Sequence, residues 1–98
     1  MISKLAHIHP NAKLGKDIII DPFAVIEDEV FIGDGTHVMA HAVILKKVTI
    51  GKSCNIFPGA VLGAIPQDLK FDGEETSVEI CDHTTIRECV TVNRGTKD

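Results

Sequence analysis

The sequence contains neither tryptophan nor tyrosine, and it has fewer basic than acidic residues. Ten Lys and Arg against fourteen Asp and Glu give a formal net charge of −4 at pH 7. A nucleic-acid-binding surface combines clustered cationic side chains with aromatic rings that stack on bases. The composition therefore argues against direct nucleic-acid binding.

Cysteine is scarce as well. Cys54, Cys81 and Cys89 are odd in number, and none forms a closely spaced pair of the kind found in metal or redox motifs. We interpret them as free thiols in packing or surface positions, because no basic partner is visible that would stabilise a thiolate. Long apolar runs are also absent, and the lead-in from Met1 to His7 does not have the character of a signal peptide. We therefore expect a cytoplasmic protein without membrane insertion.

A six-residue period dominates what is present. An aliphatic residue recurs at every sixth position and returns in the same register after one interruption. The positions are Ile8, Leu14, Ile20, Ile26, Ile32, Val38, Ile44, Ile50, Ile56 and Leu62, followed by Ile80, Ile86 and Val92. Six residues match neither the 3.6-residue helix nor a flat alternating strand, but they are typical of a parallel β-helix.

A second set of positions, four residues after each aliphatic, is predicted to point inward. It is occupied by Ala12, Ile18, Ala24, Val30, Thr36, Ala42, Val48, Cys54, Ala60, Thr84, Val90 and Thr96, nearly all small or β-branched. The residue directly after the aliphatic is Gly or acidic at Gly15, Asp21, Glu27, Gly33, Gly51 and Gly63. We expect the unusual backbone angles of each corner at this position.

Three hexads close a triangular coil, so the chain is long enough for about five coils stacked at the spacing of β-strands. The period leaves the handedness open, and the general preference for parallel crossovers is right-handed. The hexads are still running at Arg94 and Asp98. We therefore expect residues 1–98 to be one β-helix domain at the N-terminal end of a longer chain.

The period fails between Leu62 and Ile80, where Asp68 and Glu74 occupy the expected aliphatic positions. A carboxylate in a dry core without a partner is too costly, so part of the segment IPQDLKFDGEE must leave the coil as a loop. The strand pattern resumes near Ser77, because Val78 fits the second inward set. Spacing does not decide whether one whole hexad is extruded or the loop belongs inside a single coil.

Loops that interrupt a regular scaffold often carry function. Gln67, Asp68 and Lys70 offer an amide, a carboxylate and an ammonium within four positions, a set suited to binding hydroxyls and a phosphate or carbonyl. The alternative is an insertion that is merely tolerated at a corner.

At this loop the chain resembles the UDP-N-acetylglucosamine acyltransferases that begin lipid A synthesis. The resemblance runs from MISKLAHIHPNAKLG through AIPQDLKFDGEETSVEI to TTIRECVTVNRGT. The hexads occur in many acyltransferases, whereas QDLKF, GEET, IREC and NRGT are much more specific.

The resemblance implies a left-handed parallel β-helix and a homotrimer that binds substrate between subunits, without a cofactor. It implies transfer of a 3-hydroxyacyl group from acyl carrier protein to the 3-hydroxyl of UDP-N-acetylglucosamine. Gln67, Asp68 and Lys70 would contact the substrate. The family's general-base histidine lies downstream of NRGT, beyond Asp98, as do the later coils and the C-terminal helical domain, so the 98-residue chain itself is expected to be inactive.

The histidines present, His7, His9, His37, His41 and His83, lie outside that catalytic motif. His37 and His41 raise the alternative of a hexapeptide-fold zinc hydratase, but both are predicted to face outward, so no metal site is expected. Arg87, Glu88 and Arg94 also face outward by register, either in a cleft between subunits or as a surface ion pair. A further alternative is a non-catalytic trimeric β-helix module.

Overall fold

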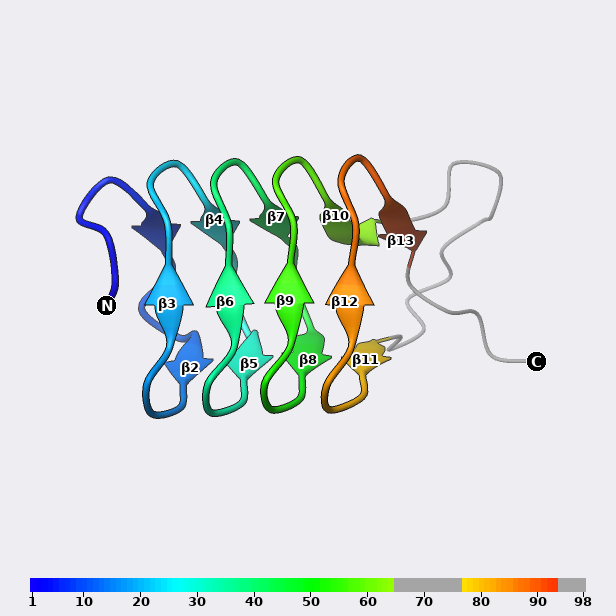
Figure 1. The fold of residues 1–98 in the computed structure, drawn as a ribbon, viewed down its shortest axis with the longest axis horizontal. Coiled ribbons are helices and arrows are strands. Elements are labelled where there is room, and N and C mark those ends of the chain that lie inside the picture. Colours follow the sequence, from blue (N-terminus) through cyan, green and yellow to red (C-terminus); the bar gives the residue numbers. More distant parts are fainter. Residues whose placement is uncertain (65–76, 94–98) are drawn as a thin grey trace.

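The computed structural model describes residues 1–64 and 77–93, and every regular element in these ranges is a short β-strand. The strands form three parallel sheets, which are the three walls of a triangular coil (Figure 1). The five-stranded sheet has the order β1 (His7–Ile8), β4 (Val25–Ile26), β7 (Val43–Ile44), β10 (Val61–Ala64) and β13 (Thr91–Asn93). The second sheet has the order β11 (Val78–Ile80), β8 (Val48–Ile50), β5 (Phe31–Ile32) and β2 (Lys13–Leu14). The third has the order β12 (Thr85–Ile86), β9 (Asn55–Ile56), β6 (His37–Val38) and β3 (Ile19–Ile20).

The coil is left-handed. In Figure 1 the chain rises along the near wall through β3, β6, β9 and β12 and crosses over the top to β4, β7, β10 and β13. It advances from left to right with each turn, which is the left-handed sense. The left-handed β-helix implied by the resemblance is confirmed, and the right-handed preference of ordinary crossovers does not apply to this fold.

Strand pairing fixes the length of each coil. Val25 pairs with Val43, and Val43 with Val61, an offset of 18 residues. After the interruption the offset becomes 30, because Val61 pairs with Thr91 and Val48 with Val78. The chain between β10 and β11 is therefore twelve residues longer than a regular coil requires. This result settles the question that spacing left open: the insertion amounts to two hexads.

The core consists of the two predicted inward sets. The aliphatic positions from Ile20 to Leu62 are fully buried, and so are the second-set positions from Ile18 to Ala60. Among residues 1–64 and 77–93, Thr36 is the one buried polar side chain; its hydroxyl donates to the Gly51 carbonyl at 2.8 Å and accepts from the Cys54 N–H at 3.1 Å. The last described coil is more open, since the exposed fraction of Val90 is 39%.

The expectation for the corners is wrong. Left-handed backbone angles occur three residues after the aliphatic, as at Phe23 (φ 67°) and His41 (φ 63°), and not at the residue directly after it. Gly15, Gly33 and Gly51 do not have such angles. They are glycines because the next coil lies against them: a Cβ on Gly33 would approach the Gly51 carbonyl oxygen to 2.7 Å. Gly63 (φ 89°) is the exception, and it lies where the insertion begins.

Candidate functional site

The predicted substrate-contacting residues Gln67, Asp68 and Lys70 lie outside the described residues. Their predicted contacts therefore remain predictions. The described residues on either side define the place on the coil from which this segment departs and to which it returns.

The departure point is built around Gly63. Leu62 pairs with Val92 and Ala64 with Asn93, so Gly63 is left over as a bulge in the ladder. A Cβ at this position would lie 2.7 Å from Cγ2 of Val48, and the φ of 89° is one that glycine adopts without a steric penalty. Two independent constraints thus require glycine where the chain leaves the coil.

The point where the chain returns to the coil also packs on Val48. Val78 pairs with Val48, and its N–H donates to the Lys47 carbonyl at 3.2 Å. Val78 is buried with an exposed fraction of 6%, which confirms that the strand pattern resumes near Ser77. Gly63 and Val78 both pack on Val48, so the two ends of the insertion are fixed at the edge between the five-stranded sheet and the β2–β11 sheet.

His37 and His9 each face a carboxylate on the outside of the coil. The Nε2 of His37 lies 2.9 Å from Oδ2 of Asp21 on the preceding coil. The Nδ1 of His9 accepts the Asn11 N–H at 3.0 Å and lies 3.6 Å from Oδ1 of Asp28. Both pairs are partly exposed, as the register predicted for His37.

His41 is exposed at a corner, where its ring stacks on Phe23 with the centroids 5.3 Å apart. His7 and His83 are also exposed. Within residues 1–64 and 77–93 of a single chain, no three His, Cys, Asp or Glu side chains come together as potential metal ligands. The cysteines are free, with Cys54 buried and Cys81 and Cys89 exposed, as predicted.

Arg87 is held on two sides. Its guanidinium carbon lies 4.7 Å above the centre of the Phe57 ring, and its Nε donates to Oε1 of Glu88 at 3.0 Å. Both charged side chains are outward, as predicted, and the arginine is 67% exposed. The pKa of Glu88 is lowered, first by the hydrogen bond from its own backbone N–H and then by Arg87. The surface ion pair, one of the two alternatives for the predicted outward residues, is present between Arg87 and Glu88, whereas Arg94 lies outside the described residues.

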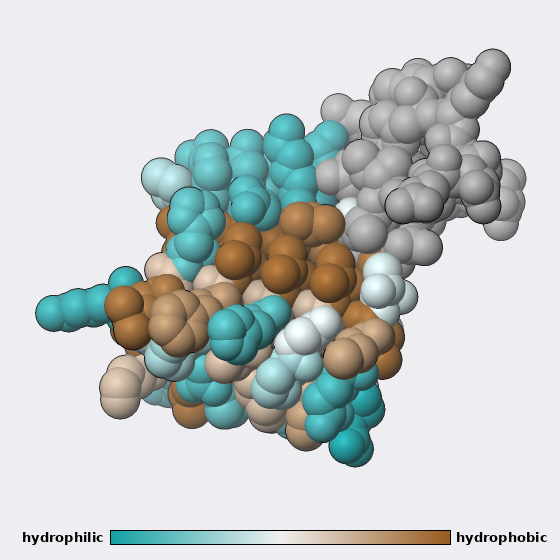
Figure 2. All heavy atoms as spheres, turned by 90° about the horizontal axis from the view of Figure 1, so that it is seen from above, coloured by the Kyte–Doolittle hydropathy of each residue, from teal (hydrophilic) through white to brown (hydrophobic). Residues whose placement is uncertain are grey.

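Sequence reasoning missed the outer surface of the five-stranded sheet. Val25, Val43 and Val61 point outward from successive coils in one register and are half-buried. Figure 2, which views the molecule from the side of β4, β7 and β10, shows a hydrophobic band flanked by hydrophilic residues. The sequence contains a signal for this row, because a valine directly precedes every third aliphatic of the six-residue period at Ile26, Ile44 and Leu62. We call these three residues the valine row.

Comparison with known proteins agrees with the coil. Residues 29–64 match the family described as bacterial transferase hexapeptide (six repeats). An acyl-[acyl-carrier-protein]–UDP-N-acetylglucosamine O-acyltransferase from Thermodesulfovibrio yellowstonii is 44% identical over 94 residues, which are 96% of this chain and 36% of that protein. The Chlamydia pneumoniae protein of the same name is 42% identical, over 97% of this chain and 34% of its own length. The crystal structure of a UDP-N-acetylglucosamine acyltransferase from Bacteroides fragilis superimposes with a TM-score of 0.94 at 58% identity, over 98% of this chain and 38% of that one.

The chain is homologous to about a third of a UDP-N-acetylglucosamine O-acyltransferase. The resemblance drawn from QDLKF, GEET, IREC and NRGT is therefore confirmed. Even the Arabidopsis UDP-N-acetylglucosamine acyltransferase, at 27% identity, superimposes with a TM-score of 0.81 over 99% of this chain and 42% of that one. In the part of the chain that the structure describes, there is no helix long and apolar enough to cross a bilayer.

Proposed function

We propose that this chain is part of a cytoplasmic acyltransferase that moves a 3-hydroxyacyl group from acyl carrier protein to the 3-hydroxyl of UDP-N-acetylglucosamine, the first step of lipid A synthesis. The observation that carries the proposal is the similarity to enzymes of that name over almost the whole chain, at 42–44% identity. Because the chain spans about a third of these relatives, the activity belongs to a longer polypeptide, of which residues 1–98 are the N-terminal β-helix domain.

The chemistry divides between these residues and a histidine beyond Asp98. That histidine removes the proton of the sugar 3-hydroxyl, whose oxygen attacks the thioester carbonyl. The negative charge that develops on the carbonyl oxygen is stabilised by a backbone N–H, and the carrier thiol leaves with a proton. In this scheme the Asp68 carboxylate accepts hydrogen bonds from sugar hydroxyls, with Gln67 beside it, and the Lys70 ammonium lies beside the acyl and sugar groups.

Assembly as a homotrimer is part of the proposal. The valine row supports it, because a row of outward aliphatic side chains on a flat parallel sheet gains free energy when a second copy covers it. His7 and Thr91 stand at the two ends of the row, in register with the valines. The substrate then binds between neighbouring subunits.

The test uses the full-length protein. Asp68→Ala and Lys70→Ala are each expected to reduce acyl transfer by about tenfold or more, since each removes a charged contact to the substrate, while the melting temperature changes little. Glu79→Ala, on the exposed face of β11, is the matched control. Unchanged turnover in both loop variants would make the loop a structural insertion, whereas absence of acyl transfer in the full-length parent protein would favour the non-catalytic trimeric module.

A further inference from the structure

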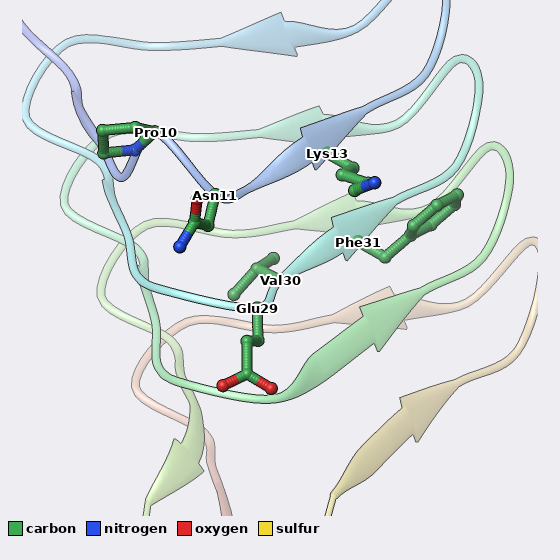
Figure 3. Close-up of a pocket in the computed structure, with 6 residues that line it drawn as sticks. All are labelled: Pro10, Asn11, Lys13, Glu29, Val30 and Phe31. Atoms are coloured by element: carbon green, nitrogen blue, oxygen red, sulfur yellow. The ribbon is translucent and has the colours of Figure 1, made fainter.

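A pocket lies on the first two coils, far from the insertion in sequence. It has a volume of about 490 Å³, within the range of small-ligand sites. Its lining consists of Pro10, Asn11, Lys13, Glu29, Val30 and Phe31. Figure 3 shows Lys13 and Phe31 projecting from the neighbouring strands β2 and β5, with Asn11 and Glu29 on the turns that lead into those strands.

Three polar side chains of this pocket are exposed, and no partner for them lies among the described residues. Across the described residues, the Lys13 ammonium, the Glu29 carboxylate and the Asn11 amide form no hydrogen bond or ion pair. Lys13 and Glu29 carry opposite charges and line one pocket, yet they do not pair with each other. A ligand that accepts from one and donates to the other satisfies both groups.

The apolar part of the pocket has a definite shape. Phe31 is the cross-strand neighbour of Lys13, and 51% of its surface is exposed, so its ring offers a flat face beside the cation. Val30, which precedes Phe31, is packed in the core. An aromatic face has partial negative charge, and it attracts the weakly positive C–H bonds of a saturated ring.

We propose that this pocket binds a small hydroxylated ring that carries an anionic group, the chemistry of a sugar phosphate. The C–H face of the ring stacks on Phe31, its hydroxyls donate to Glu29 and exchange hydrogen bonds with Asn11, and the anionic group pairs with Lys13. A purely apolar ligand would leave Lys13 and Glu29 desolvated without partners. A bare anion would make no use of Phe31 and would be repelled by Glu29. The pocket shares none of its residues with the valine row or the insertion, so its occupancy is independent of the proposed function.

The test follows backbone amide shifts of the isotope-labelled full-length protein by TROSY NMR, with three probes: glucose 6-phosphate, methyl β-D-glucopyranoside and inorganic phosphate. Glucose 6-phosphate is expected to shift the amides of residues 11–13 and 29–31 saturably, with a Kd on the order of 1 mM. The neutral glucoside shifts the same amides with a Kd about threefold higher, and inorganic phosphate binds about tenfold more weakly than glucose 6-phosphate.

Two variants separate the contacts. Phe31→Ala is expected to weaken the binding of glucose 6-phosphate and of the glucoside alike, by about fivefold. Phe23→Ala removes an equally exposed ring elsewhere and should leave both Kd values unchanged. Lys13→Met is expected to weaken the binding of glucose 6-phosphate but not of the glucoside. Lys16→Met, on the next turn, is its control. Amide dispersion reports whether each variant is folded, and Lys13→Met remains informative if Phe31→Ala does not fold. The proposal is overturned if no saturable shift occurs by 20 mM, if phosphate alone binds as tightly as the sugar phosphate, or if the paired variants behave alike.

Discussion

The backbone N–H of Lys52 donates to Oδ1 of Asp82 at 2.7 Å, although thirty residues separate the two. Two coils earlier, the N–H of Lys16 donates to Oδ1 of Asp34 at 2.8 Å, with an offset of 18 residues. The same corner contact thus forms with and without the twelve-residue insertion. The coil therefore accepts the insertion by restoring its own register immediately afterwards.

Asp82→Ala removes this contact from the coil that follows the insertion. The loss of one hydrogen bond to a carboxylate at an exposed corner is expected to destabilise that coil by about 1 kcal/mol. Hydrogen exchange should show the effect as faster exchange in β11 and β12, with strands β2 to β6 unaffected.

Asp34→Ala is the matched control, because it deletes the same contact where no insertion intervenes. The loss of stability in this variant is expected to be similar in size, but the faster hydrogen exchange should occur in β2 and β5. Asp82→Asn retains an acceptor oxygen, so it should lose less stability than Asp82→Ala. If Asp34→Ala lowered the stability of its coil and Asp82→Ala did not, the two corners would not be equivalent.

Gly51→Ala tests the crowding that explains the corner glycines. The added Cβ would meet Oδ1 of Asp82 and lie 2.7 Å from its backbone nitrogen, so a cost of about 1–3 kcal/mol is expected in urea denaturation. Because backbone atoms contribute to the clash, adding Asp82→Ala should not restore stability. Gly59→Ala is the contrasting case: its Cβ has no contact nearer than 3.7 Å, and only the left-handed angle opposes it, at about 1–2 kcal/mol. A neutral Gly51→Ala would argue against crowding as the cause.

The inward positions were predictable from the sequence, but the corner angles were not. A core position accepts few residue types, so Ile20 and Ile26 reveal the period by their chemistry. The left-handed positions are occupied by residues as different as Phe23, His41 and Ser53, so composition carries no signal there. Gly51 suggested an unusual angle, whereas its absent side chain makes room for the next coil.

The candidate site, too, was predictable from the sequence only in part. Asp68 was recognised as foreign to the coil because a packing rule forbids a carboxylate at that register. Its partners are not constrained by any repeat, so spacing says nothing about them. Val25 and Val43 recur every eighteen residues, the length of the predicted coil, but an outward position accepts most residue types, so the period alone did not identify the valine row.

Thr36→Val tests the buried hydroxyl that bridges two coils. Valine has the shape of threonine but cannot satisfy the Gly51 carbonyl or the Cys54 N–H, and a loss of about 1–3 kcal/mol is expected. Urea denaturation should show a lower midpoint with an unchanged slope. Thr49→Val, on the exposed face of β8, is the control and should be close to neutral. A similar result for both variants would mean that the two bridging hydrogen bonds contribute no net stability.

Val43→Asp tests assembly through the valine row. A carboxylate in the middle of an apolar interface loses its hydration without gaining a partner, so the variant is expected to sediment as a monomer. Thr49→Asp places the same charge on a different wall and should leave the assembly intact. Analytical ultracentrifugation of the full-length protein distinguishes the two results. Trimers of both variants would show that subunits meet elsewhere.

Arg87→Met tests the charged pair on the last described coil. The pKa of Glu88 is lowered first by the hydrogen bond from its own backbone N–H and second by Arg87, so the variant should raise this pKa without returning it fully to its ordinary value. The carboxylate is ionised at neutral pH, where the pair is intact. Its contribution is lost as the pH falls through the lowered pKa, because protonation removes the charge that Arg87 contacts. Carbon-detected NMR titration of the Glu88 carboxyl measures the midpoint directly. Lys52→Met, which removes an exposed positive charge from the previous coil, should leave that midpoint unchanged. An identical midpoint in Arg87→Met and the parent chain would mean that the 3.0 Å contact has no electrostatic effect in solution.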